Sequence, residues 1–214
     1  TRVGAVDSTA YIQNLINTQG VADLPEGTYY ISSPLVIGIT QGLIGRGTAK
    51  TIIVGMTDTF PLLSYEATGS TETVFFGAHF SLAGGSRGIR MHCTNPANYM
   101  SVSRNVFKYI NFINQSVSSI HLDQFYGFDN NFFEYINFVN TPKGIHQEVN
   151  PAYVSGETPS MMFMDKNVFT NCQWINNDVC LDLDSKRASG GNMWLNCRFD
   201  NNRIIAKMPN QIDP

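Results

Sequence analysis

Residues 105–114 read NVFKYINFIN, and residues 131–140 read NFFEYINFVN. Two further copies follow, NVFTNCQWIN at 167–176 and NMWLNCRFDN at 192–201, and a looser copy, TVFFGAHFSL, occupies 73–82. The four close copies share Asn at both ends, aromatic residues at the third and eighth positions, and Ile or Cys at the sixth. Their starts are 26, 36 and 25 residues apart, and self-similarity at such a period is typical of a solenoid.

The composition of the repeat favours strands over helices. Aromatic and β-branched residues dominate its apolar positions, as they do in strands. The flanking asparagines are turn residues that tolerate a left-handed backbone. Coils of about 25 residues, built from short strands and tight turns, predict an all-β fold, a right-handed single-stranded parallel β-helix.

Stacking of the coils at the ~4.8 Å strand spacing would place equivalent side chains in ladders. We expect two inner aromatic ladders and one ladder of turn asparagines. The first inner ladder is Phe107, Phe133, Phe169 and Trp194. The second inner ladder is Phe112, Phe138, Trp174 and Phe199. The turn ladder is Asn114, Asn140, Asn176 and Asn201.

Composition excludes several classes of function. The net charge of −3 lacks the basic field that nucleic-acid binding needs. No run approaches the ~18 apolar residues of a membrane span, so we expect no membrane insertion. Cys172 and Cys197 occupy the same inner position of consecutive coils and are expected to be buried free thiols, although a disulfide across the coils would fit that spacing. With no CxxC motif, neither a metal nor a cofactor is expected.

The first twenty residues predict a cap for the solenoid. Asp7 or Ser8 can begin a helix over 8–18, whose apolar face would cover the first coil, and Gly20 would end it. We therefore divide the chain into a capping helix, residues 1–20, and β-helix coils, residues 21–214. Nothing after Asp200 resembles a second cap, so we expect the coils to belong to a longer chain or an assembly.

The N-terminal segments GAVDSTAYIQNLI, LPEGTYYISSPLVI and QGLIGRGTAKTIIVG resemble the pectate-lyase-like right-handed β-helix superfamily. The matching positions are Asp7, Thr9, Ile12, Gln13, Pro25, Gly27, Tyr29, Ile31, Gly45 and Gly47. The Gly-Asp-Gly turn often found before the helix is missing here. Members of this superfamily include polygalacturonases, pectate lyases and bacteriophage tailspikes, so the resemblance implies the fold and a link to polysaccharides. The matching residues carry no catalytic group, which leaves the activity open.

A short second strand follows each aromatic repeat, and its alternate residues should face outward. With Ile89, Ile120, Ile145, Leu181 and Ile204 inside, the outward side chains include three of the four histidines. The expected outward set is Arg90, His92, His121, Asp123, His146, Glu148, Cys180, Asp182 and Asp184.

This outward set suggests glycoside hydrolysis. Residues i and i+2 of a strand lie ~6.6 Å apart, which suits Asp182 and Asp184 as an inverting pair of carboxyl groups. Asp123, about 9.6 Å away by stacking over two coils, is the third candidate catalytic residue. The expected substrate-binding residues are His121, His146, Arg90, His92, Glu148, Lys186 and Arg187.

Other readings of the same residues stay open. A polysaccharide lyase would use His121 or Lys186 as base, with Arg90 neutralising a uronate carboxylate. His121, His146 and Asp182 could instead hold a metal. Residues 125–129, FYGFD, are similar to the Tyr-Gly-Phe-Asp of mannuronan epimerases, but the Pro-His that follows in that family is replaced by two asparagines here. Outward charges also simply keep a solenoid surface hydrated.

Two functions therefore remain after the sequence is read. One is a depolymerase of the phage tailspike type, or a secreted hydrolase or lyase, that cuts a surface polysaccharide. The other is a non-catalytic shaft or glycan-binding module. For either we expect a polysaccharide substrate or receptor, a homotrimer as one assembly, and a place outside the cell or on the virion.

Overall fold

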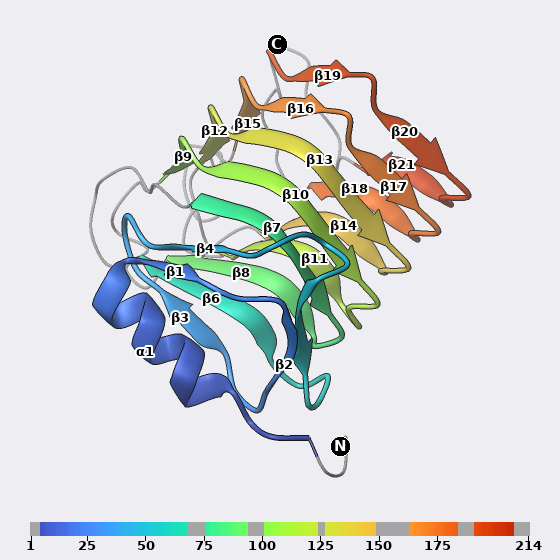
Figure 1. Ribbon diagram of the computed structural model, residues 1–214. Coiled ribbons are helices and arrows are strands. Elements are labelled where there is room, and N and C mark those ends of the chain that lie inside the picture. The colour runs from blue at the N-terminus through green and yellow to red at the C-terminus, as the bar shows by residue number, and fades with distance from the viewer. Residues whose placement is uncertain are drawn as a thin grey trace.

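The computed structural model describes residues 5–67, 76–93, 101–123, 127–148, 163–183 and 191–207. Their strands pair in parallel throughout and form three sheets around one core. The protein is a right-handed parallel β-helix with one N-terminal helix, as the repeat predicted (Figure 1).

Sheet A is the largest and carries the aromatic repeats. Its strands are β1 (Val21–Asp23), β2 (Gly27–Ile31), β4 (Gly42–Ile44), β5 (Thr51–Gly55), β7 (Phe76–Ala83), β10 (Val106–Ile113), β13 (Phe132–Val139), β16 (Val168–Thr170), β17 (Gln173–Ile175), β19 (Met193–Leu195) and β20 (Arg198–Asp200).

Sheet B holds the second strand of each coil, and sheet C is short. The strands of sheet B are β3 (Leu35–Ile37), β6 (Pro61–Ala67), β8 (Arg87–Cys93), β11 (Ser118–Asp123), β14 (Lys143–Glu148), β18 (Val179–Leu183) and β21 (Ile204–Lys207). The strands of sheet C are β9 (Ser101–Ser103), β12 (Gly127–Asp129) and β15 (Phe163–Asp165).

Both predicted aromatic ladders fill the core. Phe107 and Phe133 stack with ring centroids 4.7 Å apart, and Phe133 and Phe169 at 4.5 Å. In the second ladder Phe138 stacks on Trp174 at 4.8 Å. These rings are buried, and they stack because equivalent positions of successive coils lie one strand spacing apart.

The register of the looser repeat, 73–82, differs from the sequence prediction by two residues. Phe76 of β7 pairs with Val106 of β10, so Phe80 lies beside Ile110 rather than beside Phe112. Leu82 takes the position next to Phe112. Both Phe80 and Leu82 are buried, so a shift of the register by two residues keeps the same side chains inside. The spacing of the aromatic residues therefore does not distinguish the two registers.

Asparagines link the coils in two places. In the predicted turn ladder Asn140 Nδ2 donates to Asn114 Oδ1 at 3.2 Å, and Asn176 Nδ2 donates to Asn140 Oδ1 at 3.1 Å. These three residues have φ between 53° and 57°, the left-handed conformation that asparagine tolerates. The asparagines that open each repeat form a second, buried ladder. The sequence analysis predicted turns at these residues but did not predict this ladder. Its members are Asn105, Asn131, Asn167 and Asn192.

Helix α1 (Thr9–Gln19) covers the first coil with Ile12 and Ile16, both fully buried. Asp7 Oδ1 accepts a hydrogen bond from the Thr9 backbone N–H at 2.9 Å, and Gly20 ends the helix with φ 75°. The Gln13 amide bonds both backbone groups of Val36 in β3, at 2.8 and 2.9 Å. Residues that carry the superfamily resemblance therefore fasten the cap to the solenoid.

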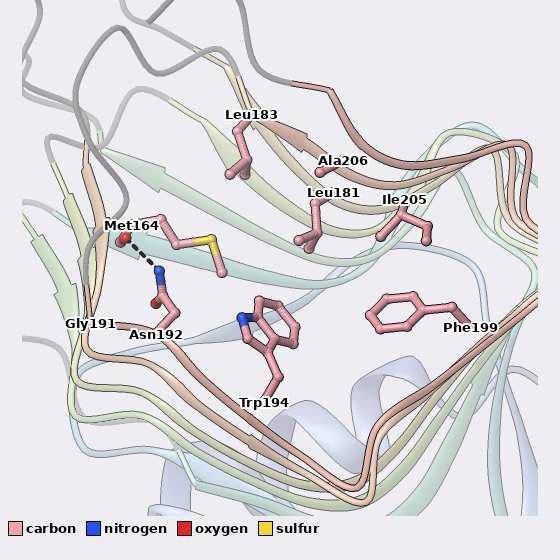
Figure 2. Close-up of a pocket in the computed structure, with 9 residues that line it drawn as sticks. All are labelled: Met164, Leu181, Leu183, Gly191, Asn192, Trp194, Phe199, Ile205 and Ala206. Carbon is pink, nitrogen blue, oxygen red and sulfur yellow. Dashed lines mark hydrogen bonds between the residues drawn. The ribbon is translucent and has the colours of Figure 1, made fainter. Parts of the chain in front are cut away.

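Within the described residues, the last coil leaves the opposite end of the core open. Trp194 and Phe199 from β19 and β20 face Leu181 and Ile205 across a hollow of about 400 Å³ (Figure 2). Trp194 is 36% exposed, whereas the equivalent Phe169 one coil earlier is fully buried. Within the described residues, no helix has the length and hydropathy needed to cross a membrane.

Candidate functional site

Sheet B carries two outward ladders of polar side chains over a floor of buried Ile89, Ile120 and Ile145. One ladder is Ser64, Arg90, His121, His146, Asp182 and Lys207. The neighbouring ladder is Glu66, His92, Asp123 and Glu148. The alternation in the sequence correctly predicted this side of the sheet for three histidines, for Arg90 and for three acidic residues. They are His92, His121, His146, Asp123, Glu148 and Asp182.

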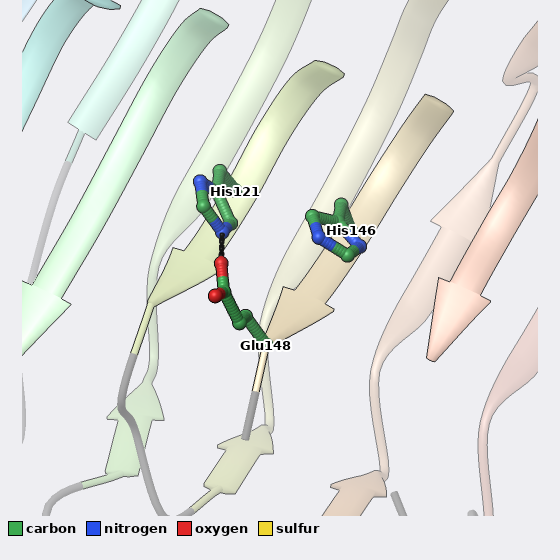
Figure 3. Close-up of side chains that lie close together, drawn as sticks. All are labelled: His121, His146 and Glu148. Carbon is green, nitrogen blue, oxygen red and sulfur yellow. Dashed lines mark hydrogen bonds and ion pairs between the residues drawn. The ribbon is translucent and has the colours of Figure 1, made fainter. Parts of the chain in front are cut away.

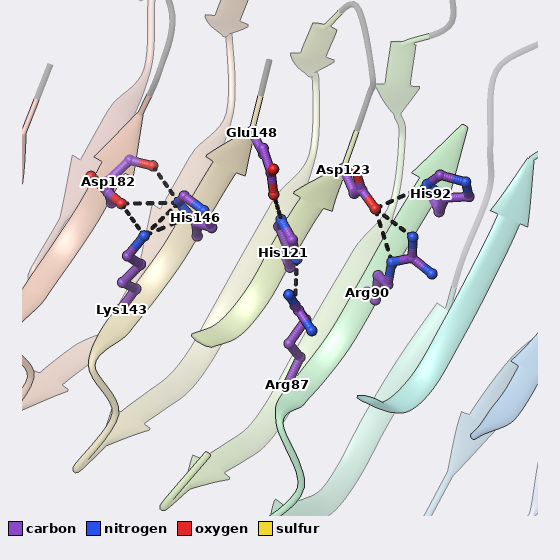
Figure 4. Close-up of polar contacts among 9 residues, drawn as sticks. All are labelled: Arg87, Arg90, His92, His121, Asp123, Lys143, His146, Glu148 and Asp182. Atoms are coloured by element: carbon purple, nitrogen blue, oxygen red, sulfur yellow. Dashed lines mark hydrogen bonds and ion pairs between the residues drawn. The ribbon is translucent and has the colours of Figure 1, made fainter. Parts of the chain in front are cut away.

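Side chains of these ladders, together with Arg87 and Lys143, form three bonded groups (Figure 4). We call the three groups together the sheet B cluster. It consists of Arg87, Arg90, His92, His121, Asp123, Lys143, His146, Glu148 and Asp182. Strands β8, β11, β14 and β18 supply its members, so four consecutive coils contribute.

Asp123 is held by two basic side chains of the preceding coil. Arg90 Nε donates to Asp123 Oδ2 at 3.0 Å, and His92 Nδ1 lies 3.0 Å from the same oxygen. Burial by itself would raise the pKa of Asp123, but the hydrogen bond and charge of Arg90, with His92 and His121, outweigh it and lower the pKa below its usual value. Asp123 is therefore ionised at neutral pH.

His121 lies between a cation and a carboxylate. Arg87 Nε donates to its Nδ1, and its Nε2 lies 3.0 Å from Glu148 Oε2. Only 2% of His121 is exposed, whereas the side chain of Glu148 is 57% exposed. Burial, with the charge of Arg87 and the nearby His146, lowers the pKa of His121 to about 3, so the ring is neutral at pH 7.

The third group centres on Asp182. Lys143 Nζ lies 2.6 Å from Asp182 Oδ2, and His146 Nδ1 lies 3.0 Å from the same atom. The His146 ring also stacks on His121, with centroids 4.9 Å apart. Burial and the charge of Lys143 lower the pKa of His146, although Asp182 opposes this shift. Asp182 thus has a fixed orientation set by two neighbours.

Three expectations about the outward set need correction. Cys180 is fully buried and belongs to the core, because the strand does not alternate strictly at this corner. Ile204 pairs with Val179, so Lys207 is the neighbour of Asp182 in β21. Asp123 does not stack in line with Asp182, because the Asp182 ladder passes through His146 and His121. Asp123 lies two residues after His121 on β11, so it belongs to the neighbouring ladder.

Several predicted residues cannot be placed. Asp184, Lys186 and Arg187 lie outside the described residues, and the pairing of Asp182 with Asp184 stays a prediction. Of the FYGFD stretch, Asp129 lies on sheet C, where Ser103 Oγ donates to it at 3.1 Å.

Arg87 and Lys143 are members of the cluster that the sequence analysis missed. Strict alternation would place each on the inner side, together with Ile89 and Ile145. Each is followed by a glycine that turns inward: a Cβ on Gly144 would lie 2.5 Å from the Cys180 carbonyl oxygen, and one on Gly88 would lie 2.4 Å from the Phe112 ring. The glycine that follows each of these basic residues is the feature of the sequence that could have indicated the break in alternation.

His121, His146 and Glu148 could offer three metal ligands, with ligand atoms within 4.8 Å of one another (Figure 3). The hydrogen bonds favour a different use. Because Arg87 donates to Nδ1 of His121, the ring proton lies on Nε2, which is the atom that would have to bind the metal. Lys143 adds a positive charge 3.3 Å from the nitrogens of His146. These contacts describe a hydrogen-bonded acid–base group rather than a metal centre.

Comparison with known proteins adds only distant similarities. No family model matches the chain, and no curated protein matches it. Among solved structures, ORF18 of Geobacillus virus E2 aligns with a TM-score of 0.41 and 14% identity, over 96% of this chain and 59% of that one. The A-module of the mannuronan C-5 epimerase AlgE4 from Azotobacter vinelandii aligns with a TM-score of 0.33 and 11% identity, over 97% of both chains. The chain thus spans 59% of the length of the viral protein, and its function has to be argued from its own site.

Proposed function

We propose that this protein binds a polysaccharide along sheet B and cleaves it by carboxylate acid–base chemistry, as a depolymerase of the phage tailspike type. One observation carries the proposal: carboxylates, histidines and arginines line up on the outside of four consecutive coils. A straight row of donors and acceptors along the solenoid matches a chain of sugar hydroxyls better than it matches a compact ligand.

Asp182 is the carboxyl group best placed to act on a glycosidic bond. Lys143 and His146 fix its orientation, which an acid–base group needs. Its proposed partner in an inverting reaction is Asp184, because residues i and i+2 of a strand lie ~6.6 Å apart, although Asp184 is outside the described residues. Asp123 is ionised, which suits a base or a group that stabilises positive charge on the sugar ring, and excludes the role of general acid.

The remaining cluster residues would bind sugar. The side chains of Glu148, Arg90 and His92 are 57%, 30% and 19% exposed. Glu148 can accept from sugar hydroxyl groups, and Arg90 and His92 can bond hydroxyl groups or a uronate. Lys186 and Arg187 follow β18 in the sequence, outside the described residues, and stay candidate sugar-binding residues.

The proposal is tested by screening bacterial capsular, O-antigen and plant polysaccharides for new reducing ends and for absorbance at about 235 nm, which reports the unsaturated sugar of a lyase. We expect reducing ends without absorbance. Asp182→Asn should lower kcat/KM by about 10²-fold or more, as removal of an acid–base group does.

Glu134→Gln is the matched control, because Glu134 pairs with Lys108 at 3.1 Å on sheet A, outside the cluster. It should leave cleavage unchanged. Absorbance in the screen would mean a lyase, with Lys186 as the candidate base, because both ring nitrogens of the buried His121 are already bonded. Full activity in Asp182→Asn would remove Asp182 from the mechanism.

A non-catalytic module is the second candidate, and the internal pairing of the cluster favours it. Asp123 and Asp182 each contact a cation and a histidine, and His121 is almost fully buried, as a stabilising ladder requires. Binding of a glycan without any cleavage would support this function. The proposal also includes assembly into a homotrimer and a location outside the cell or on a virion. Light scattering would measure the oligomeric state.

A further inference from the structure

Cys172 and Cys197 lie side by side in consecutive coils, outside the sheet B cluster. Gln173 pairs with Arg198, and the Arg198 backbone N–H donates to the Cys172 carbonyl oxygen at 2.9 Å, so the two cysteines are direct neighbours. Both thiols are free. Earlier coils place the paired residues Ile110 and Ile136 at this inner position.

The two thiols differ in their access to solvent. Cys172 is fully buried, and its Sγ contacts the carbonyl oxygens of Phe133 and Thr170. Cys197 repeats this arrangement with Phe169 and Leu195, but it is only partly buried, because it belongs to the last described coil. An oxidant from solution therefore reaches Cys197 first.

The spacing of the backbone suits a covalent link. Neighbouring strands lie ~4.8 Å apart, within the ~4.4–6.8 Å between Cα atoms that disulfides span. Both side chains already point to the same side of the strands, into the core. Because a disulfide spans ~3.5–4.5 Å between Cβ atoms, bridge formation needs rotation of both side chains and a small approach of the two coils.

We propose that Cys172 and Cys197 are a modification site, a thiol pair that a small disulfide such as oxidised glutathione converts into a disulfide across two coils. The Cys197 thiolate attacks the glutathione disulfide and releases one glutathione thiolate. The Cys172 thiol loses its proton to water, and its sulfur attacks the Cys197 sulfur and releases the second glutathione thiolate. The two glutathione thiolates take up protons from water, which balances the two protons lost by the protein thiols. Two protein thiols are oxidised, and one glutathione disulfide is reduced to two glutathione molecules.

The acidity of the thiols agrees with this order. A hydrogen bond between the two thiols lowers the pKa of Cys197, and the same bond together with burial raises the pKa of Cys172, so Cys197 is the thiol that ionises first. Burial raises the pKa of Cys180 to about 12. Cys180 is a buried thiol of the same protein and serves as an internal comparison.

The bridge would join the exposed last coil to the coil before it. The disulfide would limit separation of β20 from β17 at the open end of the core, where Trp194 and Phe199 are incompletely covered (Figure 2). We expect slower amide exchange in residues 193–207 of the oxidised protein than of the reduced protein.

The test treats the folded protein with oxidised glutathione at pH 7.5 and measures its intact mass and its peptides under non-reducing conditions. We expect the loss of two hydrogens and a peptide pair that links Cys172 to Cys197. Cys172→Ser should keep a stable glutathione adduct on Cys197, and Cys197→Ser should take no adduct on Cys172. Cys180→Ser should behave as the unaltered protein does.

Two results would overturn the proposal. One is a glutathione adduct on Cys197 that persists although Cys172 is present, because the second attack then does not occur. The other is complete alkylation of both thiols after the oxidant, because no bond has then formed.

Discussion

At the scale of single residues, the buried histidine explains how the sheet B cluster can be both polar and stable. His121 uses one ring nitrogen to accept from Arg87 and the other to bond Glu148, so its polar atoms are satisfied although almost none of the side chain is exposed. A protonated ring could not accept from Arg87. The cluster therefore depends on neutral histidine.

Stability should consequently fall as the pH is lowered. The pKa of His121 is about 3 in the folded protein, against an ordinary 6.5, so between these values the unfolded chain binds a proton that the folded protein does not. We expect the free energy of unfolding to decrease from pH 6.5 towards pH 3, by up to about 1.4 kcal/mol per pH unit for this residue. His146, whose pKa is also lowered, adds to the slope.

Urea unfolding between pH 7.5 and pH 5 measures this slope. His121→Gln, whose amide can still accept from Arg87 and donate to Glu148, should reduce it. His79→Gln, on the exposed part of β7, is the control and should leave it unchanged. An unchanged slope in His121→Gln would contradict the assignment of a neutral, buried ring.

At the scale of elements, the buried asparagine ladder binds strands of different coils more firmly than the exposed one. Asn131 Oδ1 accepts from both the backbone N–H and the side chain of Asn105, and its Nδ2 donates to Val102 and Asn167. Asn131 is 1% exposed, so no water can replace these bonds. By contrast, the Asn140 and Asn114 side chains bond each other in an exposed turn.

Asn131→Ala should therefore destabilise the protein by about 2–4 kcal/mol, because it leaves several buried groups without partners. Asn137→Ala is the matched control. Asn137 donates to Asn111 at 2.7 Å on the outer, half-buried face of the same strand, β13, and its loss should cost about 1 kcal/mol or less. Midpoints of urea unfolding compare the two variants, and equal losses would refute the special role of the buried ladder.

At the scale of the whole molecule, the two ends of the solenoid differ. Helix α1 closes the N-terminal end with Ile12 and Ile16, whereas the described part of the last coil leaves Trp194 and Ile205 exposed. The backbone N–H groups of Met193, Arg198 and Ile204 bond back to the preceding coil. Within the described residues, no further coil covers their other side.

Hydrogen exchange should reveal this difference. We expect the amides of residues 193–207 to exchange at least about tenfold faster than those of β13, which lies between two coils, because a terminal repeat has one stabilising interface instead of two. Mass spectrometry of exchanged peptides resolves the two regions. Equal protection would mean that another part of the protein, or a second copy, covers the end.

The sequence by itself determined the class of fold and much of the core. The aromatic repeat, its spacing and the asparagines at its ends are local properties, and a parallel stack converts each of them directly into a ladder. Alternation along the second strand likewise predicted that Arg90, His121, His146 and Asp182 face outward on one sheet.

Only the tertiary structure decided which side chains meet. The length and shape of each turn set the register of the next coil, and a shift of two residues leaves the inward pattern unchanged, as Phe80 and Ile204 show. The inward turn at Gly88 and Gly144 brings Arg87 and Lys143 to the outer face, against strict alternation. These long-range contacts bury His121 and so keep its ring neutral. The reason is that solvent access and hydrogen-bond partners depend on neighbouring coils, not on the residues next to His121 in the chain.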